Sequence, residues 1–519
     1  MSPPPECSAE AARPPPDGSG PGRARRGAGP PGRLLGSVRP LRHRSYAVLW
    51  SAGLVSTIGS WMQSVAVGAL LISRTGEATW AVLVAAAAFL PIGLLSPVGG
   101  ALADRIARRP VLVAGNVAAA AVAVLLAVEV GSGRGSPAVL VGLVAVQGSA
   151  SAVIGPFQQA ILPDLVPADE FLPAIALNSA QFNLGRIAGP ALAGAAIAAF
   201  GYPLAFDANA VSFLAVVVAL AFVRLAPPAG RGHGSLLGSL RQGFAVARRQ
   251  PSCWAAVVTI AVVALIASPF IALVPAMAER LAGGDARSVA TATGVLTTAQ
   301  GIGAVAGALC LASLAARLGS GRLLAGSLLV LPAALVLYGS AQSLWWGALA
   351  LFAVGAIYIS VMSGLSAVVQ FHAPSLYRGR VLSFYLVALG VAYPVGSLLQ
   401  GPVVDRLGIG WTTSATALLL WLVLGIAYAT LPAPRRALLL PPPADRVPGL
   451  PTPTRADLAA APLLAVIRVG RTCRAVEPGP RRAPSSLWSR RAPRAGGPGG
   501  RPEPGCGGRR EPGSRRASR

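Results

Sequence analysis

The amino-acid sequence predicts an all-α membrane protein with twelve transmembrane helices in two six-helix bundles, flanked by disordered termini. The first reason is composition: of the 519 residues, 54% are hydrophobic and 12% are charged, and the mean hydropathy is +0.61. An ordinary soluble domain carries about twice that share of charge. The second reason is that apolar segments long enough to cross the hydrocarbon of a bilayer, about 20 residues each, recur along the chain. The third is a polar stretch that divides these segments into two equal groups.

The predicted helices follow one another with short polar breaks. We expect the first six at residues 46–73, 80–103, 110–130, 137–160, 171–200 and 203–223, and the second six at 253–276, 289–314, 323–338, 344–371, 381–404 and 412–431. The two bundles then span residues 41–223 and 252–431. The linker between them, residues 224–251, contains five Arg and no acid. Its apolar residues recur at roughly helical spacing from Leu236 to Val246, so we expect an amphipathic helix on the cytoplasmic face.

The two tails differ in composition from the bundles. Residues 1–40 and 432–519 are rich in Pro, Gly and Arg and poor in aromatic residues. Such a composition cannot bury enough apolar area to order the chain, so we expect both tails to be disordered. The tails also hold most of the net charge of +26, and a folded nucleic-acid-binding domain therefore has little support.

The distribution of Arg predicts the orientation in the membrane. Arg gathers in the loops after the second, sixth, eighth and tenth segments. Loops rich in Arg lie on the cytoplasmic side of a membrane, so we expect these four loops there. Both termini are then cytoplasmic. One loop departs from this pattern, because residues 163–170 contain three acids and no Arg. The chain has no Lys, which indicates a GC-rich bacterial genome, and we expect the protein in the bacterial inner membrane.

Neither catalysis nor metal binding is indicated. The three His fall in predicted loops, and the sequence contains no group of His, Cys, Asp and Glu with the spacing of metal ligands. A phosphate-binding loop of the Gly-Lys-Ser/Thr type requires a Lys. ATP-driven transport by this chain alone is therefore disfavoured, and we expect no enzymatic activity, no metal and no cofactor.

A motif lies between the second and third segments, where residues 100–109 read Gly-Ala-Leu-Ala-Asp-Arg-Ile-Ala-Arg-Arg. Small residues let two helices approach closely, and an acid at this place can face the N-terminus of a neighbouring helix. An ordinary positive-inside loop would account for the Arg residues alone. The full pattern, Gly-x-Leu-x-Asp-Arg-x-x-Arg-Arg, resembles the loop motif of the major facilitator superfamily, a family of twelve-helix secondary transporters.

The resemblance covers nearly all of residues 41–431 and looks closest to the exporter branch that includes enterobactin and macrolide efflux proteins. It is carried by residues 54–61, 162–167, 207–213 and 378–381. It implies two bundles that rock about a central cavity, with the loop motif latching the outward-open state. The residues to which the resemblance assigns this latch are Gly100, Leu102, Asp104, Arg105, Arg108 and Arg109.

A second motif lies in the fifth segment, where Gly185, Gly189, Pro190 and Gly194 are similar to the Gly/Pro motif of antiporter members. In those members a glycine-lined groove and a proline bend set the contact between the fifth and eighth helices. The match is incomplete because Ala193 replaces one glycine, and plain helix packing is the alternative. The eleventh segment ends with a similar set, which fits an internal repeat of the two halves: Pro394, Gly396, Gly401, Pro402, Asp405 and Arg406.

Arg186 is the most informative single charge, because it lies near the middle of the fifth segment. A charge there costs several kcal/mol unless it faces protein or water. Snorkelling to the interface would need a helix that begins much later than its apolar run allows. We expect Arg186 to line the central cavity and to engage an anionic substrate group or an acid.

Proton coupling needs a titratable group within the membrane, and Asp207 is the candidate that we favour over Glu129 and Asp104. The proton-linked exporters of the superfamily carry an Arg before a Gln-Gly pair in the fourth helix. This chain has Val144 at the matching position, so their coupling pathway does not carry over. Amide side chains within such helices often bond only to a neighbouring helix. As a set they indicate a substrate pocket, and its expected members are Gln63, Gln147, Asn178, Gln181, Asn209 and Gln300.

These observations predict a secondary active transporter that exports a small amphipathic molecule, such as a drug, antibiotic or siderophore, by alternating access coupled to protons. The expected partners are the substrate, the proton and the lipid bilayer, with no nucleic acid, and the expected state is a monomer. One alternative is an importer or facilitator of the same fold. Another is a membrane receptor or scaffold that does not transport.

Overall fold

The computed structural model of the chain describes residues 38–103, 105–133, 135–223, 225, 236–283, 285–374 and 377–430. These residues form helices, turns and connecting segments, and no strand occurs among them. Asp104 of the loop motif lies outside the described residues. So do residues 1–37 and 431–519, which contain nearly all of the two predicted tails.

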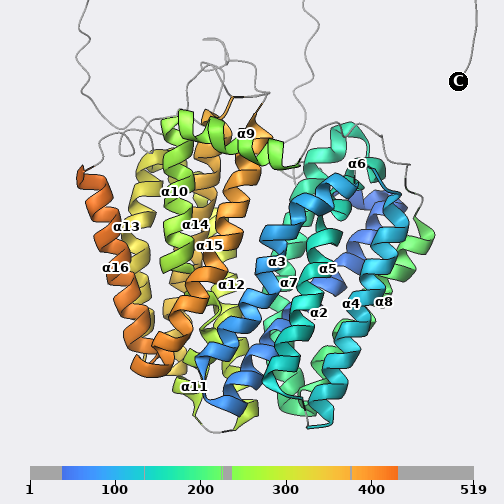
Figure 1. The fold of residues 1–519 in the computed structure, drawn as a ribbon, viewed down its shortest axis with the longest axis horizontal. Coiled ribbons are helices and arrows are strands. Elements are labelled where there is room, and N and C mark those ends of the chain that lie inside the picture. Colours follow the sequence, from blue (N-terminus) through green and yellow to red (C-terminus); the bar gives the residue numbers. More distant parts are fainter. Residues whose placement is uncertain are drawn as a thin grey trace, which may run out of the picture. The chain divides into compact units, whose positions relative to one another are not determined.

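The first half contains six long helices, each within a few residues of a predicted segment (Figure 1). They are α2 (Arg44–Thr75), α3 (Ala78–Ala103), α4 (Arg108–Gly131), α5 (Pro137–Ala160), α7 (Phe171–Phe200) and α8 (Pro203–Phe222). Local signals set several of their ends. Gly76, with φ of 68°, terminates α2, and Ser136 caps α5 by accepting a hydrogen bond from the backbone N–H of Val139. Short helices connect some of them: η1 (Arg39–Arg42), α6 (Leu162–Leu165) and η2 (Ala168–Glu170).

The second half begins with the predicted amphipathic helix, α9. Its helices are α9 (Leu236–Arg249), α10 (Pro251–Ile266), η3 (Ser268–Ile271), α11 (Val274–Ala282), α12 (Ala286–Leu318), α13 (Ser320–Gly339), α14 (Leu344–His372), α15 (Arg378–Leu407) and α16 (Ile409–Thr430). The ring of Phe244 on α9 packs edge-on against the rings of Trp254 and Phe384, so the apolar face of this helix rests on α10 and α15.

One predicted helix is wrong in detail. The segment 253–276, expected as a single helix, is broken into α10, η3 and α11. Pro269 and Pro275 explain the break, because proline has no N–H to donate and its ring clashes with the preceding turn of a helix. The Ser268 hydroxyl donates to the carbonyl of Val263 at 3.3 Å, which satisfies an acceptor that the break would leave free.

Ten helices of the described residues are long and apolar enough to cross a membrane, or eleven if α9 and α10, which meet at 114°, count as one span. Helix α7 is not among them although it has 30 residues. Its mean hydropathy is lowered by polar residues that include Gln181 and Arg186. Helix α10 has 16 residues and reaches membrane-spanning length only together with the segments that adjoin it.

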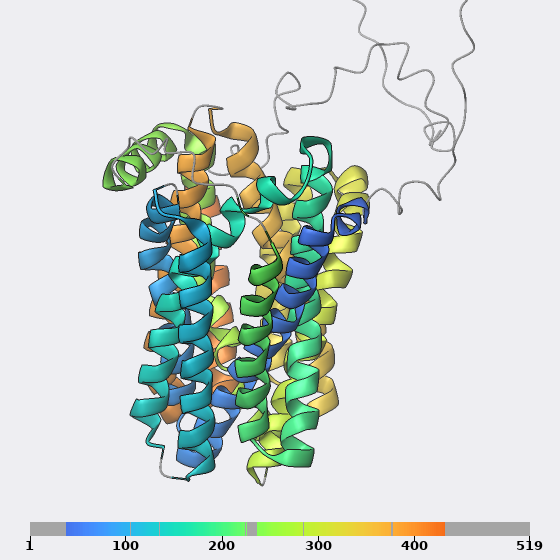
Figure 2. The same cartoon turned by 90° about the vertical axis from the view of Figure 1, so that its right-hand side faces the viewer.

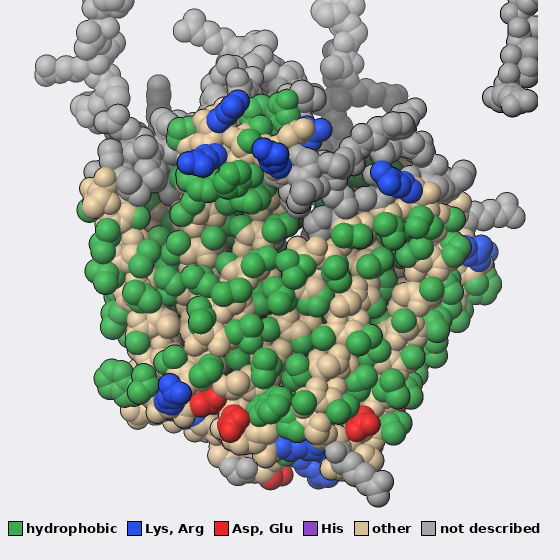
Figure 3. Space-filling view, in the orientation of Figure 1, with side chains coloured by type: hydrophobic (Ala, Val, Ile, Leu, Met, Phe, Trp, Pro, Cys, Tyr) green, Lys and Arg blue, Asp and Glu red, His purple; other side chains and the backbone are tan. Residues whose placement is uncertain are grey.

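The long helices run between two ends of the bundle, which we name the α9 end and the α11 end. Helices α9 and α6 lie at the first and α11 at the second (Figure 1). The start of α2 also lies at the α9 end (Figure 2). On the face drawn in Figure 3, a group of Arg side chains lies at the α9 end without acidic side chains, while Arg and acidic side chains lie together near the α11 end.

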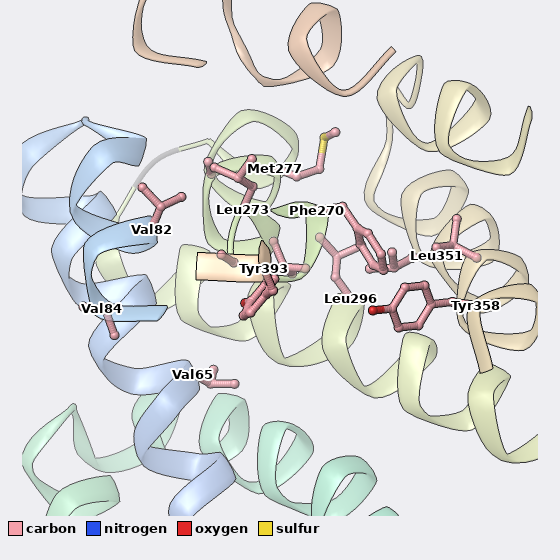
Figure 4. Close-up of a cluster of buried hydrophobic side chains, with 14 of the residues drawn as sticks. Val65, Val82, Val84, Phe270, Leu273, Met277, Leu296, Leu351, Tyr358 and Tyr393 are labelled. Carbon is pink, nitrogen blue, oxygen red and sulfur yellow. The ribbon is translucent and has the colours of Figure 1, made fainter. Parts of the chain in front are cut away.

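One continuous core joins the two halves. Val65, Val82 and Val84 of the first half belong to the same buried cluster as Phe270 and Leu296 of the second (Figure 4). These side chains have between 0 and 6% of their surface exposed. The two halves therefore share a packed apolar interface in this conformation.

Candidate functional site

The first of two seams between the halves is formed by α3 and α15. A Cβ atom at Gly93 would lie 3.0 Å from the carbonyl carbon of Gly390, so the two backbones meet there. Further toward the α11 end, the rings of Phe89 and Tyr393 pack edge to face with centroids 5.5 Å apart. Beyond them Gly401 of α15 lies against the first turns of α3. From pair to pair the residue number increases along one helix and decreases along the other, so the two helices are antiparallel.

The second seam is formed by α7 and α12, and it contains the Gly/Pro motif. The carbonyl oxygen of Pro190 lies 2.6 Å from the place that a Cβ atom of Gly294 would take. The Tyr202 hydroxyl donates to the carbonyl of Ala286 at 2.7 Å, at the α11 end of this seam. At its other limit, a Cβ at Gly301 would lie 3.3 Å from the backbone oxygen of Arg186.

The four motif residues take different parts in this packing. Gly194 approaches Thr291 of α12, so it belongs to the seam with Pro190. Gly185 and Gly189 instead face α2, where a Cβ would lie 2.5 Å from Thr57 Cγ2 and 2.4 Å from Trp61 Cβ, respectively. The motif thus lets one helix approach two neighbours, a role that both the antiporter and the packing interpretations require.

Both seams lie toward the α11 end of their helices. Toward the α9 end, each of the four helices carries large apolar side chains that are exposed: Leu94 on α3, Leu172 on α7, Leu309 on α12 and Leu386 on α15, with 55 to 76% of their surface accessible. The close approaches across the halves thus run from the α11 end to about the middle of these four helices. Exposed apolar side chains also occur at the α11 end, where Phe200 of α7 and Leu407 of α15 have 75% and 64% of their surface accessible.

Three of the predicted pocket residues meet in one buried network inside the first half. The side-chain N–H of Asn209 on α8 donates to Oε1 of Gln63 on α2 at 2.7 Å, and the Gln63 N–H donates to Oε1 of Gln147 on α5 at 2.6 Å. All three are buried, with 0 to 8% exposed. Gly59 leaves the space for this network, because a Cβ there would lie 2.7 Å from Asn209 Oδ1. These amides bond helix to helix, which is the alternative role considered for them.

The other three predicted amides lie apart from this network. Asn178 accepts a hydrogen bond from the Tyr46 hydroxyl at 3.1 Å, near the α9 end of α7. Gln181 donates to Oγ1 of Thr57 at 3.5 Å. Gln300 on α12 is 1% exposed, and its side-chain nitrogen has no hydrogen-bond partner within the described part of the chain.

Arg186 lies where the α7–α12 seam ends, near the middle of α7, and its side chain is half-buried. Helix α12 connects Arg186 with α14, which carries Tyr358: Gly301 of α12 approaches the backbone oxygen of Arg186, and Gly355 of α14 approaches that of Gln300. The Tyr358 hydroxyl is 2.8 Å from Oγ of Ser268, and its ring packs against Phe270 with centroids 5.7 Å apart. No ion pair involves Arg186 among the described residues. The structure thus places a cation, Arg186, and a phenol group, Tyr358, near the end of the α7–α12 seam that is farthest from the α11 end. We name this region the inner limit of the seams.

Sequence reasoning missed Tyr358 and Ser268. A single tyrosine within the apolar run 344–371 has no periodic or motif signal, because the groups that it meets depend on how α14 packs against α10 and α12. Asp207 is exposed on α8 and forms no hydrogen bond or ion pair in the part of the chain that the structure describes. The structure does not bring Asp207 to Arg186 and Tyr358.

Arg108 and Arg109 of the loop motif bind residues of the first half. Nη1 of Arg108 donates to Oδ2 of Asp164 at 2.6 Å, and Nη2 of Arg109 donates to the carbonyl of Ala221 at 3.0 Å. The carbonyl of Leu102 accepts from the backbone N–H of Arg105, and Gly100 has open space around its Cα.

The acid-rich loop between α5 and α7 is explained by these partners. Asp164 pairs with Arg108, and Glu170 accepts hydrogen bonds from Arg42 at 3.2 Å and pairs with His43 at 3.0 Å. Two of the three acids that departed from the positive-inside pattern, Asp164 and Glu170, thus pair with basic residues of neighbouring elements.

Comparisons with known proteins agree with this fold. A family model described as a transmembrane secretion effector matches residues 35–442. The multidrug efflux pump Tap of Mycobacterium tuberculosis is 28% identical over 398 residues, which are 75% of this chain and 94% of the pump. The staphyloferrin A transporter of Staphylococcus aureus is 30% identical over 173 residues, 33% of this chain and 44% of that protein. Among solved structures, a bacterial homologue of the human lysosomal transporter Spinster, inward-facing and unoccupied, superposes with a TM-score of 0.58 and 16% identity, covering 76% of this chain and 98% of that one.

Proposed function

Because the chain belongs to the transmembrane secretion effector family of major facilitator superfamily transporters, we propose that it exports a small amphipathic molecule by proton-coupled alternating access. The observation that carries this proposal is the pair of seams. In both α3–α15 and α7–α12, the close backbone approaches between the halves run from the α11 end to about the middle of the helices. Two halves that meet along two antiparallel seams can exchange which end is closed by rocking.

The membrane topology that we propose has twelve spans in two groups of six, over residues 41–223 and 252–431. Helix α7 supplies one span beyond the ten that stand on hydropathy alone, and α10, η3 and α11 together supply another. Because the number of spans is even, the start of the first span and the end of the last span lie on the same side of the membrane, at the α9 end. The gathering of Arg at the α9 end favours the cytoplasm for that side, so this conformation is inward-open.

The substrate site that we propose lies at the inner limit of the seams, around Arg186 and Tyr358. A half-buried guanidinium without an acidic partner in the described residues favours an anionic group on the substrate. The edge-to-face ring pairs nearby favour an aromatic or apolar body. The names of the two relatives, a multidrug efflux pump and a staphyloferrin A transporter, support a small molecule as cargo, and the first supports export.

The coupling proton needs a carrier, and Asp207 is the candidate that we retain from the sequence. Its side chain is exposed on α8, so it can exchange a proton without first opening the packed interior. Asp207→Asn should uncouple transport from the proton gradient while leaving substrate binding intact.

Transport by the full chain in inside-out membrane vesicles tests the proposal. A panel of labelled lipophilic drugs and siderophores is offered with an imposed proton gradient, and with a protonophore. We expect gradient-dependent accumulation that Arg186→Ala abolishes and Arg186→Lys partly retains. Arg287→Ala, which removes an exposed Arg near the α11 end, is the matched control and should transport normally.

The other interpretations predict different results in the same vesicles. Movement that ignores the protonophore would indicate a facilitator, and accumulation only in right-side-out vesicles would indicate an importer. An inserted protein that moves nothing across the panel would favour a receptor or scaffold. Normal transport by Arg186→Ala would remove Arg186 from the substrate site.

A further inference from the structure

The last turn of α15 holds a carboxylate that reaches across to the other half. Oδ1 of Asp405 accepts a hydrogen bond from the backbone N–H of Ala78 at 2.5 Å, and Oδ2 accepts one from the N–H of Thr79 at 3.2 Å. The Thr79 hydroxyl donates to the same Oδ2 atom. Ala78 and Thr79 are the first two residues of α3. One side chain of the second half thus binds three donors of the first.

The chemistry of this contact is that of a helix cap. The N–H groups of the first turn of a helix have no partner within that helix, and the helix dipole places partial positive charge there. A carboxylate accepts hydrogen bonds from these N–H groups, and its negative charge is stabilised by the dipole. Here the cap is supplied by a residue 326 positions later in the chain, from the other half, and not by the residue that precedes α3.

The cap stands at the α11 end of the α3–α15 seam, where the two helices already approach closely. A Cβ at Gly401 would lie 3.1 Å from Thr79 Cα and 2.5 Å from Val82 Cγ2. Gly401 and Asp405 are one helical turn apart, so the glycine brings α15 close enough for the carboxylate to reach the end of α3. The seam cannot open at this end without breaking all three hydrogen bonds.

We propose that Asp405 is a latch that holds the α11 end closed, through the N-terminus of α3, in the conformation described here. It is a positioning residue: it acts on the equilibrium between the two conformations and does not contact the site around Arg186 and Tyr358. The inference rests on alternating access between two conformations, as in the proposed function, but on no particular substrate or coupling ion.

The sequence around Asp405 contains a short pattern that also occurs in the loop motif. Residues 401–406 read Gly-Pro-Val-Val-Asp-Arg, and residues 100–105 read Gly-Ala-Leu-Ala-Asp-Arg. Both follow the pattern Gly-x-x-x-Asp-Arg near the end of a seam helix. In α15 the pattern supplies a glycine for close approach and an acid that caps the partner helix, and the structure shows both in use.

The test measures conformation directly, in the full chain without substrate. Spin labels at Val139→Cys on α5 and Gln342→Cys before α14, both exposed near the α11 end, report the separation of the halves there. The background replaces the exposed Cys310 and the tail cysteines Cys7, Cys473 and Cys506 by serine. Double electron–electron resonance then gives the populations of the closed and open α11 end.

We expect Asp405→Ala to raise the ratio of open to closed populations about tenfold, the scale of losing one helix cap. Thr79→Val, which keeps its shape and loses one donor, should shift it in the same direction by less. The matched control is Asp285→Ala. Asp285 caps α12 at the same end, but through Ser288 of its own helix, at 3.1 Å to the backbone N–H. The Asp285 carboxylate bonds to Ser288 of α12 and to no donor of the first half, so we expect a smaller change in the distance distribution than in Asp405→Ala.

Two results would overturn the latch. One is a distribution for Asp405→Ala that matches the parent protein, and the other is an equal shift in Asp285→Ala, which would indicate a general effect of losing a cap. If Asp405→Ala does not insert, Asp405→Asn retains one acceptor oxygen and should give an intermediate shift. The readout needs no transport, so a failure of the latch and a failure of the proposed export are separate outcomes.

Discussion

The carbonyl oxygen of Pro190 on α7 lies 2.6 Å from the position that a Cβ atom of Gly294 on α12 would occupy. The two backbones belong to different halves of the protein, and no side chain fits between them. Part of the Gly/Pro motif therefore lies at the interface between the halves, which the proposed rocking would separate.

Gly294→Ala should weaken the closed α11 end, because the added methyl group meets a backbone atom that cannot rotate away. Overpacking of this kind costs about 1–3 kcal/mol. We expect a lower melting temperature in detergent and a larger population with the α11 end open in the spin-label experiment. Gly326→Ala on α13 is the control, since a Cβ there has open space around it. Equal behaviour of the two variants would contradict a tight seam.

The buried amide network of the first half should behave as a structural element. Gln63→Leu leaves the amides of Gln147 and Asn209 without their shared partner, and each unsatisfied buried group costs about 1–3 kcal/mol. We expect a clear loss of thermal stability with little change in KM for any exported substrate. Asn183→Ala, which removes a hydrogen bond within its own helix, should leave both quantities nearly unchanged. A raised KM with normal stability would instead return Gln63 to the substrate site.

The cap of α12 should contribute stability that depends on pH. Hydrogen bonds from the hydroxyl and backbone N–H of Ser288 lower the pKa of Asp285 below its ordinary value. A carboxyl whose pKa is lower in the folded protein stabilises it above the unfolded pKa, and that contribution is lost as the pH falls through the folded value. The melting temperatures of the parent protein and Asp285→Asn should therefore converge as the pH falls from about 5 through the lowered pKa of Asp285. A constant difference across that range would contradict a contribution from the ionised cap.

Much of the helical organisation was predictable because the signals are local. Segments 137–160 and 171–200 coincide with α5 and α7, since a polar or proline-containing break marks each of their ends. The break of 253–276 into α10, η3 and α11 was missed although Pro269 and Pro275 were visible. A continuous apolar composition concealed it, because hydropathy measures affinity for lipid and not the continuity of a helix.

The candidate site was only partly predictable. Arg186 stood out because a charge in an apolar run is costly unless something accommodates it. Its neighbour Tyr358 did not, since tyrosine is common in such helices. Gln63, Gln147 and Asn209 were recognised as polar groups, but nothing in their spacing indicated that they bond to one another. The residues come from three helices, and small rotations of any one would separate them.

The sequence by itself determined which segments are helical and apolar enough for a membrane, because each segment's length, hydropathy and terminal residues decide this without reference to the others. Only the tertiary structure decided which polar groups meet. The reach of Asp405 to Ala78 and Thr79, and of Arg108 to Asp164, depends on the register and rotation of helices that are far apart in the chain. Those two quantities follow from the packing of all the helices at once, and no single stretch of sequence encodes them.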